Sequence, residues 1–349
     1  MFRRPIPDRL EARWSSGFAP LFTGGRMYLG LREFRAAAGR FALVVGVVTL
    51  LAFMVVALSA LTEGLRQQSV SAVEKLPGAA LLVQEDGDKP ALLSDSEITR
   101  TAGEGTELGV ATLRASHDGA NSTVAVFGRG DVHEVAVSPD IAKTLGVVPG
   151  GSIQLGSTTV RVDRVADVGQ YAHQQVISMP VGEWREVTHR DSVNALIVDS
   201  DSAAPAGLVR VARADLPDLV PGFSSEHMSL LLIQGLLVVI SAVVVCGFFA
   251  VWTGQRIGSL AVVRAMGAGR WYLLRDGLAQ AGSVLVVGLA LGAALAVGFA
   301  SLLSGKAPVV VDPAAGATVL AGMAVLGLVG AALALRPLVK VDPLVALNR

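Results

Sequence analysis

The chain has 349 residues, of which 52% are hydrophobic, 17% are charged and only 5% are aromatic. Such an aliphatic composition is atypical of a soluble enzyme. The 29 basic residues balance the 29 acidic ones, so the chain lacks the basic excess of nucleic-acid-binding proteins, and we expect no nucleic-acid partner. Its single cysteine, Cys246, excludes an internal disulfide, and no Cys/His spacing of the zinc type occurs in the sequence.

Four stretches of the sequence lack Asp, Glu, Lys and Arg and are long enough to cross a bilayer, which takes about 20 helical residues. They are residues 41–62, 228–255, 277–305 and 313–335. These stretches are apolar all round, so they have no polar face to present to water. The small residues at 57–60 resemble a signal-peptide cleavage site, but the apolar segment before them is too long and starts too late. We therefore expect four membrane helices in a multi-pass protein of the cell membrane.

The positions of the basic residues predict the orientation of these helices. Eight arginines precede the first stretch: Arg3, Arg4, Arg9, Arg13, Arg26, Arg32, Arg35 and Arg40. Further basic residues lie in the loop 256–276 and in the tail 336–349, whereas the short loop 306–312 has only Lys306. Because positive loops stay in the cytoplasm, this pattern places both termini there. The N-terminal segment, residues 1–40, is expected to include an amphipathic helix from about residue 29.

The same topology places residues 63–227 outside the membrane, as one α+β domain inserted between the first and second membrane helices. Strand-like runs bounded by turn residues occur in it at 80–83, 123–127, 152–155, 159–165 and 195–198. Ser138 as N-cap, Pro139 in the first turn and Gly146 at the C-cap predict a short helix among them.

The first membrane helix is expected to continue outward as an amphipathic stalk to about residue 76. Its apolar positions recur at helical spacing while Glu63 and Arg66–Gln68 lie between them. Pro77-Gly78 then ends the helix. In the third stretch, Gly288 and Gly292 form a small-xxx-small step that allows another helix to approach closely.

Two sequence motifs resemble a known family. The loop reads GQRIGSLAVVRAMGAGRWYLLRDGLAQA at residues 254–281, and the chain ends in VDPLVALNR at 341–349. Both are similar to the FtsX-like, MacB-type permeases of ABC transporters, in which an R-A-[LM]-G-A stretch, here 264–268, precedes the third membrane helix. The stretch SPDIAKTLGVVPGGSIQLGSTTVRVDRV resembles the β-rich part of their external domains. This chain departs from the family where an acidic residue usually precedes the Arg, so an acid-to-base contact with the ATPase is either absent or replaced, with Asp276 as the candidate replacement.

The resemblance implies a homodimer in the membrane with two copies of a separate ATPase subunit on its cytoplasmic face. The sequence has no G-x-x-x-x-G-K-[ST] loop, so ATP would be bound by the partner and this chain would be non-catalytic, with no intrinsic cofactor. The coupling residues implied by the resemblance are Arg256, Ile257, Arg264, Ala265, Met266, Gly267 and Arg270. Positive-inside topology alone is an alternative explanation of these arginines.

The size of the external segment and the loop sequence are most similar to the haem-exporting and DevC-type branch of the family. Haem offers a flat apolar ring, two carboxylates and an iron that accepts His, Met, Tyr or carboxylate ligands. Candidate residues for it at the outer membrane surface are Glu63, Arg66, Gln67, His227 and Met228. Phe53 and Met54 in the first span could pack on the ring, and Tyr171 and His173 of the external domain are a second candidate pair. Glu63 or His227 would ligate the iron, and Arg66 would pair with a propionate.

Alternative interpretations remain at this point. Glu63 can be the first solvated residue outside the bilayer, and Arg66 a headgroup anchor. The family also includes exporters of antibiotics, peptides and lipids. A different class of function is FtsX-like signalling, in which the external domain activates a partner such as a cell-wall hydrolase.

Overall fold

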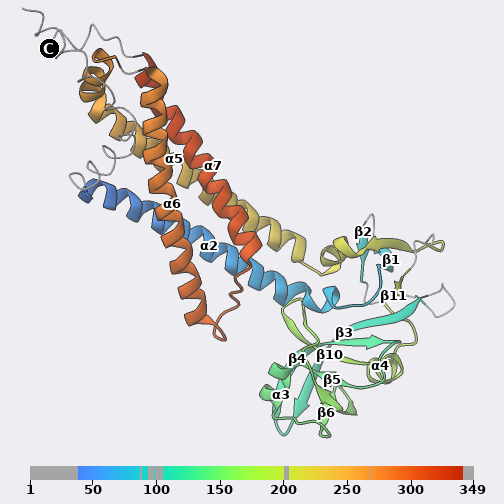
Figure 1. The fold of residues 1–349 in the computed structure, drawn as a ribbon. Coiled ribbons are helices and arrows are strands. Elements are labelled where there is room, and N and C mark those ends of the chain that lie inside the picture. The colour runs from blue at the N-terminus through green and yellow to red at the C-terminus, as the bar shows by residue number, and fades with distance from the viewer. Residues whose placement is uncertain are drawn as a thin grey trace, which may run out of the picture. The chain divides into compact units, whose positions relative to one another are not determined.

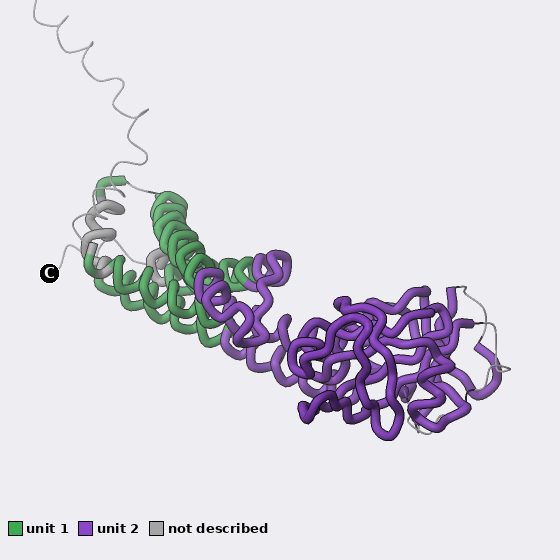
Figure 2. Tube along the Cα trace, turned by 90° about the horizontal axis from the view of Figure 1, so that it is seen from below, with its two compact units in different colours: residues 1–54, 238–295, 320–349 green, residues 55–237, 296–319 purple. Residues whose placement is uncertain are grey.

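The structure is a computed structural model. It describes residues 38–86, 89–92, 98, 105–199, 204–267 and 269–340, without the side chains of 38, 40, 256–265, 270 and 337–340. The expected N-terminal amphipathic helix before residue 38 and the C-terminal motif at 341–349 lie outside these residues. The chain divides into two compact units, coloured separately in Figure 2: residues 1–54, 238–295 and 320–349, and residues 55–237 and 296–319.

Four helices among the described residues are long and apolar enough to cross a membrane. They are α2 (Ala38–Glu74), α5 (Phe223–Ala265), α6 (Arg270–Leu303) and α7 (Pro313–Lys340), and the strands all lie between the first two of them (Figure 1). The predicted fold class, four membrane helices with an α+β domain inserted between the first and the second, is confirmed.

The helices extend further than the apolar stretches. Helix α2 continues to Glu74, and α5 begins at Phe223, five residues before the second stretch. The segment 256–276, expected as a loop, is mostly helical, since α5 runs to Ala265 and α6 starts at Arg270. A single apolar stretch locates the part of a helix inside the bilayer but does not show where the helix ends.

Within the first unit, α6 packs against α2 through its small residues. A Cβ atom built on Gly288 would lie 2.6 Å from a methyl of Val48, and one on Gly292 would lie 2.5 Å from the Cβ of Ala52. The backbone carbonyl of Thr49 is 2.7 Å from the same position on Gly292. The two glycines therefore let the helix backbones approach closely, as small-xxx-small steps do in membranes.

We expect Gly292→Ala to destabilise the protein in detergent by about 1–2 kcal/mol, because the added methyl would clash with the side chain of Ala52 and with backbone atoms of α2. The measurement is thermal unfolding of the purified chain. Gly298→Ala, on the same helix with nothing within 4 Å of the added Cβ, is the control and should leave stability unchanged or slightly raised. Equal effects of both substitutions would contradict this packing.

The inserted domain is built on a mixed sheet of twelve strands. Its main path runs β12-β1-β11-β3-β4-β10-β5-β8. The strands are β1 (Ala80–Asp86), β2 (Lys89–Ala91), β3 (Thr106–His117), β4 (Ala120–Arg129), β5 (Ala136–Val137), β6 (Ser152–Leu155), β7 (Thr158–Arg161), β8 (Arg164–Val165), β9 (Gln170–Tyr171), β10 (Gln174–Pro180), β11 (Ala195–Val198) and β12 (Val209–Ala212). Two pairs, β4 with β10 and β5 with β8, are parallel and the others are antiparallel. The chain enters the domain in β1 and leaves it in β12, and these two strands pair directly.

Three short helices complete the domain: α3 (Pro139–Leu145), α4 (Val181–Thr188) and the 3₁₀ helix η3 (Arg213–Leu219). Gly146 ends α3 in the left-handed conformation, with φ 70°, as its sequence indicates. Ser138 stands at the N-cap position, but its side chain makes no capping hydrogen bond, which corrects its expected role.

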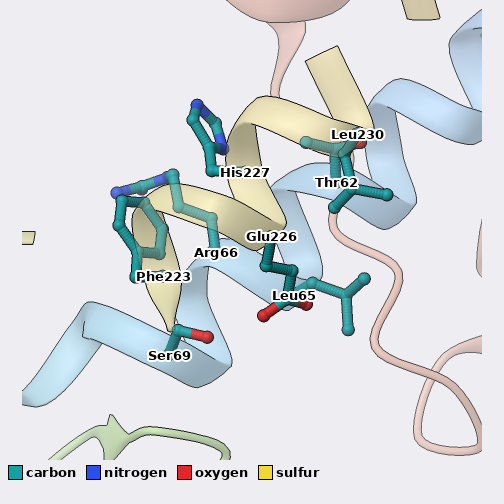
Figure 3. Close-up of a pocket in the computed structure, with 8 residues that line it drawn as sticks. All are labelled: Thr62, Leu65, Arg66, Ser69, Phe223, Glu226, His227 and Leu230. Carbon is teal, nitrogen blue, oxygen red and sulfur yellow. The ribbon is translucent and has the colours of Figure 1, made fainter. Parts of the chain in front are cut away.

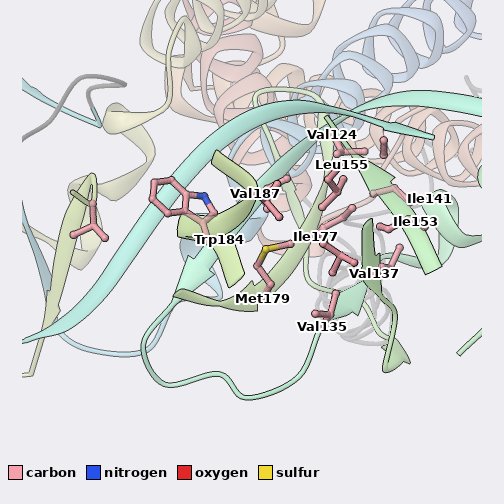
Figure 4. Close-up of a cluster of buried hydrophobic side chains, with 14 of the residues drawn as sticks. Val124, Val135, Val137, Ile141, Ile153, Leu155, Ile177, Met179, Trp184 and Val187 are labelled. Carbon is pink, nitrogen blue, oxygen red and sulfur yellow. The ribbon is translucent and has the colours of Figure 1, made fainter. Parts of the chain in front are cut away.

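Two separate hydrophobic cores stabilise the domain. The first contains Trp184 of α4 and Ile141 of α3 packed on strand residues such as Ile177 (Figure 4). The second contains residues from the end of α2, from η3 and from the start of α5, among them Leu76, Leu219 and Phe223. The ends of both long helices are thus part of the core of the domain.

Candidate functional site

The candidate site is a shallow depression between the C-terminal half of α2 and the first turns of α5, all within the second unit (Figure 3). It holds about 170 Å³ of empty space, part of it open to solvent. Its lining residues are Thr62, Leu65, Arg66, Ser69, Phe223, Glu226, His227 and Leu230. Apolar and ionisable side chains alternate around it, a combination suited to an amphipathic ligand.

A network of charged side chains runs along α2 at the depression. Arg66 makes a bidentate ion pair with Glu63, with both N···O distances at 2.8 Å, and its third nitrogen lies 2.5 Å from an oxygen of Glu74. Gln67 donates a further hydrogen bond of 3.0 Å to Glu63. Residues three or four apart share one helix face, and Glu74 lies two turns further along the same face. Sequence spacing thus brings together three of the predicted site residues.

This network changes the role that we expected for Arg66. Its guanidinium is bound by two carboxylates, so it is not available to a propionate unless one of them is released. The carboxylate of Glu63 is likewise engaged by Arg66 and Gln67. Together with Glu226, the charged residues of the site carry more negative than positive charge.

His227 is the imidazole that faces this site from α5. Its ring stacks on the ring of Phe223, with the centroids 5.2 Å apart and an angle of 15° between the planes. Among the residues that the structure describes, its ring nitrogens have no hydrogen-bond or ion-pair partner. The next residue, Met228, is 58% exposed. The two residue types that commonly ligate haem iron therefore stand together at the start of α5 with their donor atoms available.

His173 reaches the site from the domain, between β9 and β10. Its Nε2 lies 3.1 Å from Oγ of Ser69 on α2 and 2.9 Å from a carboxylate oxygen of Glu226 on α5. The imidazole thus connects three elements. A catalytic Ser-His-acid relay uses both ring nitrogens, one for each partner. Here both contacts converge on the same nitrogen, so this arrangement is structural.

The turn that carries His173 is bound closely to α2. Ala172 and His173 have φ values of 47° and 61°, and their N–H groups donate to the carbonyls of Ser69 and Gln68 at 2.9 and 3.1 Å. These bonds stabilise a conformation that non-glycine residues rarely adopt. Gly169 allows the close approach, since a Cβ there would lie 2.6 Å from the backbone nitrogen of Ala72.

Tyr171, which was paired with His173 as a candidate ligand, lies instead in the second hydrophobic core. Its ring packs edge-on against Phe127 with centroids 5.4 Å apart. Burial raises the pKa of Tyr171 to about 12, because the apolar surroundings disfavour the phenolate. The side chain is 6% exposed, so it is not available to a ligand in this conformation.

The remaining predicted residues lie away from the depression. Phe53 and Met54 belong to the other compact unit, where Phe53 is half-buried and Met54 is exposed. Of the expected coupling residues, Arg256, Ile257, Arg264 and Ala265 lie on the last turns of α5, Arg270 opens α6, and Met266 and Gly267 form the turn between these helices. Gly267 has φ 101°, which only glycine adopts readily. Met266 is exposed, as are Trp271 and Tyr272 at the start of α6.

Sequence reasoning missed six residues of the site: Thr62, Leu65, Ser69, Phe223, Glu226 and Leu230. Glu226 directly precedes His227, and helical spacing from Phe223 to His227 predicts one face, so part of this set had a signal in the sequence. The apolar stretch was taken to start at Met228, and the helix turns before it were therefore left out.

Comparison with known proteins found several chains similar to this one. A crystal structure of the extracellular domain of the noncanonic ABC-type transporter YknZ from Gram-positive bacteria is similar to part of this chain. The match covers 36% of this chain and 84% of the YknZ chain, with 12% sequence identity and a TM-score of 0.27. Proteins assigned by name as hemin transport system permease protein HrtB match over 92% of this chain and 99% of their own length. The one from Staphylococcus haemolyticus (strain JCSC1435) is 23% identical, and the one from Staphylococcus epidermidis (strain ATCC 12228 / FDA PCI 1200) is 20% identical.

The C-terminal membrane region gives the family. Residues 231–343 match the family described as FtsX-like permease C-terminal. This range begins inside α5 and includes α6 and α7. This match, the four membrane-length helices, the α+β domain inserted after the first of them and the full-length relatives make the chain similar to FtsX-like permeases of ABC transporters, and residues 231–343 are its FtsX-like permease region.

Proposed function

We propose that this chain is the membrane subunit of an ABC-type efflux pump that exports haem or a similar amphipathic molecule. The inserted domain faces the outside and both termini face the cytoplasm, as the distribution of basic residues favours. The chain itself is non-catalytic, and a separate ATPase subunit binds and hydrolyses ATP. Movement of α2 and α5 carries the force of hydrolysis to the site.

The observation that carries this proposal is the depression at the start of α5. Its lining combines the imidazole of His227, stacked on Phe223, with the guanidinium of Arg66, which is paired with Glu63. The exposed Met228 follows His227 along α5. An iron porphyrin requires an apolar surface for its ring and a His, Met or carboxylate for its iron. The similarity to hemin transport permeases over 92% of the chain supports the same cargo.

The charged network allows Glu63 to act as an iron ligand without leaving a buried charge. If Glu63 turns to the cargo, Arg66 keeps its contact with Glu74, so its guanidinium stays paired. His227 needs no such exchange, and we assign it as the first ligand to engage. Gln67, which donates to Glu63, would help to orient that carboxylate.

The depression of one chain is only part of a cargo site. Its empty space of about 170 Å³ includes open solvent, so the depression of one chain does not enclose a cargo of that kind. A two-fold homodimer would bring a second copy of the depression to the same place and enclose a flat cargo between the copies. Phe53 and Met54, on the first membrane helix, stay candidates for packing on the ring of the cargo.

The ATPase would dock at the turn between α5 and α6. Met266, Trp271 and Tyr272 present exposed apolar surface there, and aromatic residues and Met are enriched in protein interfaces. The coupling residues from Arg256 to Arg270 lie on both sides of this turn. Force applied at the turn reaches the depression along α5, which is one uninterrupted helix of 43 residues.

Absorption titration of the purified chain with haemin in detergent tests the proposal. We expect a saturable shift of the Soret band, and His227→Ala should weaken binding by about tenfold or more, since even residues that only support a ligand contribute tenfold or more. Glu63→Gln should shift the band with a smaller loss of affinity.

His133→Ala is the matched control, because His133 is exposed on the same domain and lies outside the depression. It should leave both the spectrum and the affinity unchanged. A haemin spectrum identical to that in empty micelles would exclude haem as the cargo, and the search would turn to other amphipathic molecules.

A further inference from the structure

Arg213 binds the end of α2, although it lies at the opposite, C-terminal end of the inserted domain in the sequence. Its guanidinium donates to three backbone carbonyls: Glu74 at 2.6 Å, Leu76 at 2.9 Å and Gly78 at 3.0 Å. The last carbonyls of a helix have no partner within the helix. A cation at a helix C-terminus is also favoured by the helix dipole. Arg213 therefore satisfies the acceptors at the point where α2 ends.

The backbone of Arg213 belongs to the segment that leads into α5. It is the first residue of η3, directly after β12, and its own N–H donates to the carbonyl of Ala79 at 3.1 Å. Ala79 in turn immediately precedes β1, which pairs with β12 in the register Ala80 to Ala212. Arg213 thus connects the end of α2 to η3, the short helix that precedes α5.

Hydrophobic packing surrounds this connection. The second core contains Leu76, two residues after α2, Leu216 and Leu219 of η3, and Phe223 of α5, all less than 9% exposed. Only three residues separate Leu219 from Phe223, so α5 starts directly from this core. Separating the end of α2 from the start of α5 would require both loss of this packing and release of three charge-assisted hydrogen bonds.

We propose that Arg213 is a positioning residue, a lock that holds the end of α2 next to the segment from which α5 starts. The two helices of one chain then move together and transmit force to the domain jointly. This inference rests on the proposed function, because it concerns how movement of the helices reaches the domain. In each copy, the depression lies next to this fixed contact between the end of α2 and the start of η3. The opening through which the cargo enters therefore lies between the two copies of the chain.

Hydrogen exchange measures the lock itself and requires neither cargo nor ATPase. In Arg213→Ala, the amides of Lys75, Leu76, Gly78 and Ala79 should exchange about tenfold faster, because this segment can open without breaking the three hydrogen bonds of Arg213. Amides of the central strands β3 and β4 should keep their protection, which shows that the domain is folded. Arg213→Lys keeps the charge but lacks the planar fork of donors, so it should give an intermediate rate.

A distance measurement tests the transmission. The complex of the chain with its ATPase is spin-labelled at Lys143→Cys, an exposed position on α3, in a Cys246→Ser background. The distance between the two copies is then measured with and without nucleotide. Nucleotide is expected to change the ratio of the populations with a short and a long distance. We expect this change to be about fivefold smaller in Arg213→Ala, while ATPase activity is maintained. Arg161→Ala, an exposed arginine on β7, is the control and should keep the full shift.

Each outcome decides the inference. A full nucleotide-induced shift in Arg213→Ala, or unchanged exchange at residues 75–79, would overturn it. If the Ala variant loses protection throughout the domain, Arg213→Lys takes its place with the same criteria. A chain that binds no haemin but shows the shift, and loses it in Arg213→Ala, would remove the proposed cargo while supporting the lock. No shift in the unsubstituted complex would overturn both force transmission and the lock.

Discussion

Trp184→Ala is expected to destabilise the inserted domain by about 3–5 kcal/mol, the range for removing a large aromatic side chain from a core. Trp184 is fully buried. Its ring lies over Gly109 and Gly128, which are paired across β3 and β4, and a Cβ on either glycine would lie 2.3–2.6 Å from Trp184 atoms. The surrounding backbone cannot collapse into the space left by the indole, because it belongs to the two central strands.

Urea unfolding of the full chain in detergent, followed by pulse proteolysis, measures this effect without relying on the fluorescence of the removed indole. Val148→Ala is the control, since Val148 is 66% exposed on the same domain, and its effect should stay within about 0.5 kcal/mol. A loss of less than about 1 kcal/mol for Trp184→Ala would contradict the central role of this side chain.

Gly64→Ala is the second substitution with a large expected effect. A Cβ at this position of α2 would lie 1.9 Å from the carbonyl oxygen of Pro308 and 2.4 Å from its carbonyl carbon, in the loop between α6 and α7. Next to it, the N–H of Val310 donates to the carbonyl of Ala60 at 3.0 Å. The loop must move away from α2, and because the obstacle is backbone, we expect a cost of about 3 kcal/mol, at the upper end for an overpacked site.

Thermal unfolding and tryptic cleavage after Lys306 in that loop both report the change. The variant should unfold at a lower temperature and be cleaved faster. Gly46→Ala is the matched control on the same helix, where nothing lies within 4 Å of the added Cβ. There the loss of glycine should be neutral or stabilise by up to about 1 kcal/mol. If Gly64→Ala behaves like Gly46→Ala, the loop does not press on α2.

The membrane helices were readable from sequence because a bilayer imposes a single strong requirement, a long run without charge. The domain was less readable. The short runs at β1 and β11 are continuous and apolar, and they were found. The longest strand, β3, was missed because its apolar residues are interrupted by Gly109, Arg114 and Ser116. These residues fit the sheet through the pairing of β3 with β4, a partner that no local pattern reveals.

The site shows the same limit. Helical spacing was enough to group Glu63, Arg66 and Gln67 on one face of α2. It did not show that Glu63 and Arg66 neutralise each other, since i and i+3 charges can also face solvent separately. His173 is 104 residues from Ser69 in sequence, and their contact depends on the whole sheet placing the β9–β10 turn against α2. Arg213 acts on backbone carbonyls, which carry no sequence signal at all.

The pairing of β1 with β12 also bears on how such permeases diversify. Because the chain enters and leaves the domain in adjacent strands, Ala80 beside Ala212, everything between them is a single insertion whose two ends are neighbours. Insertions with adjacent ends are tolerated because they leave the host framework undisturbed. The segment between β1 and β12 can therefore be exchanged for a larger or smaller module while the chain still enters and leaves it at neighbouring points.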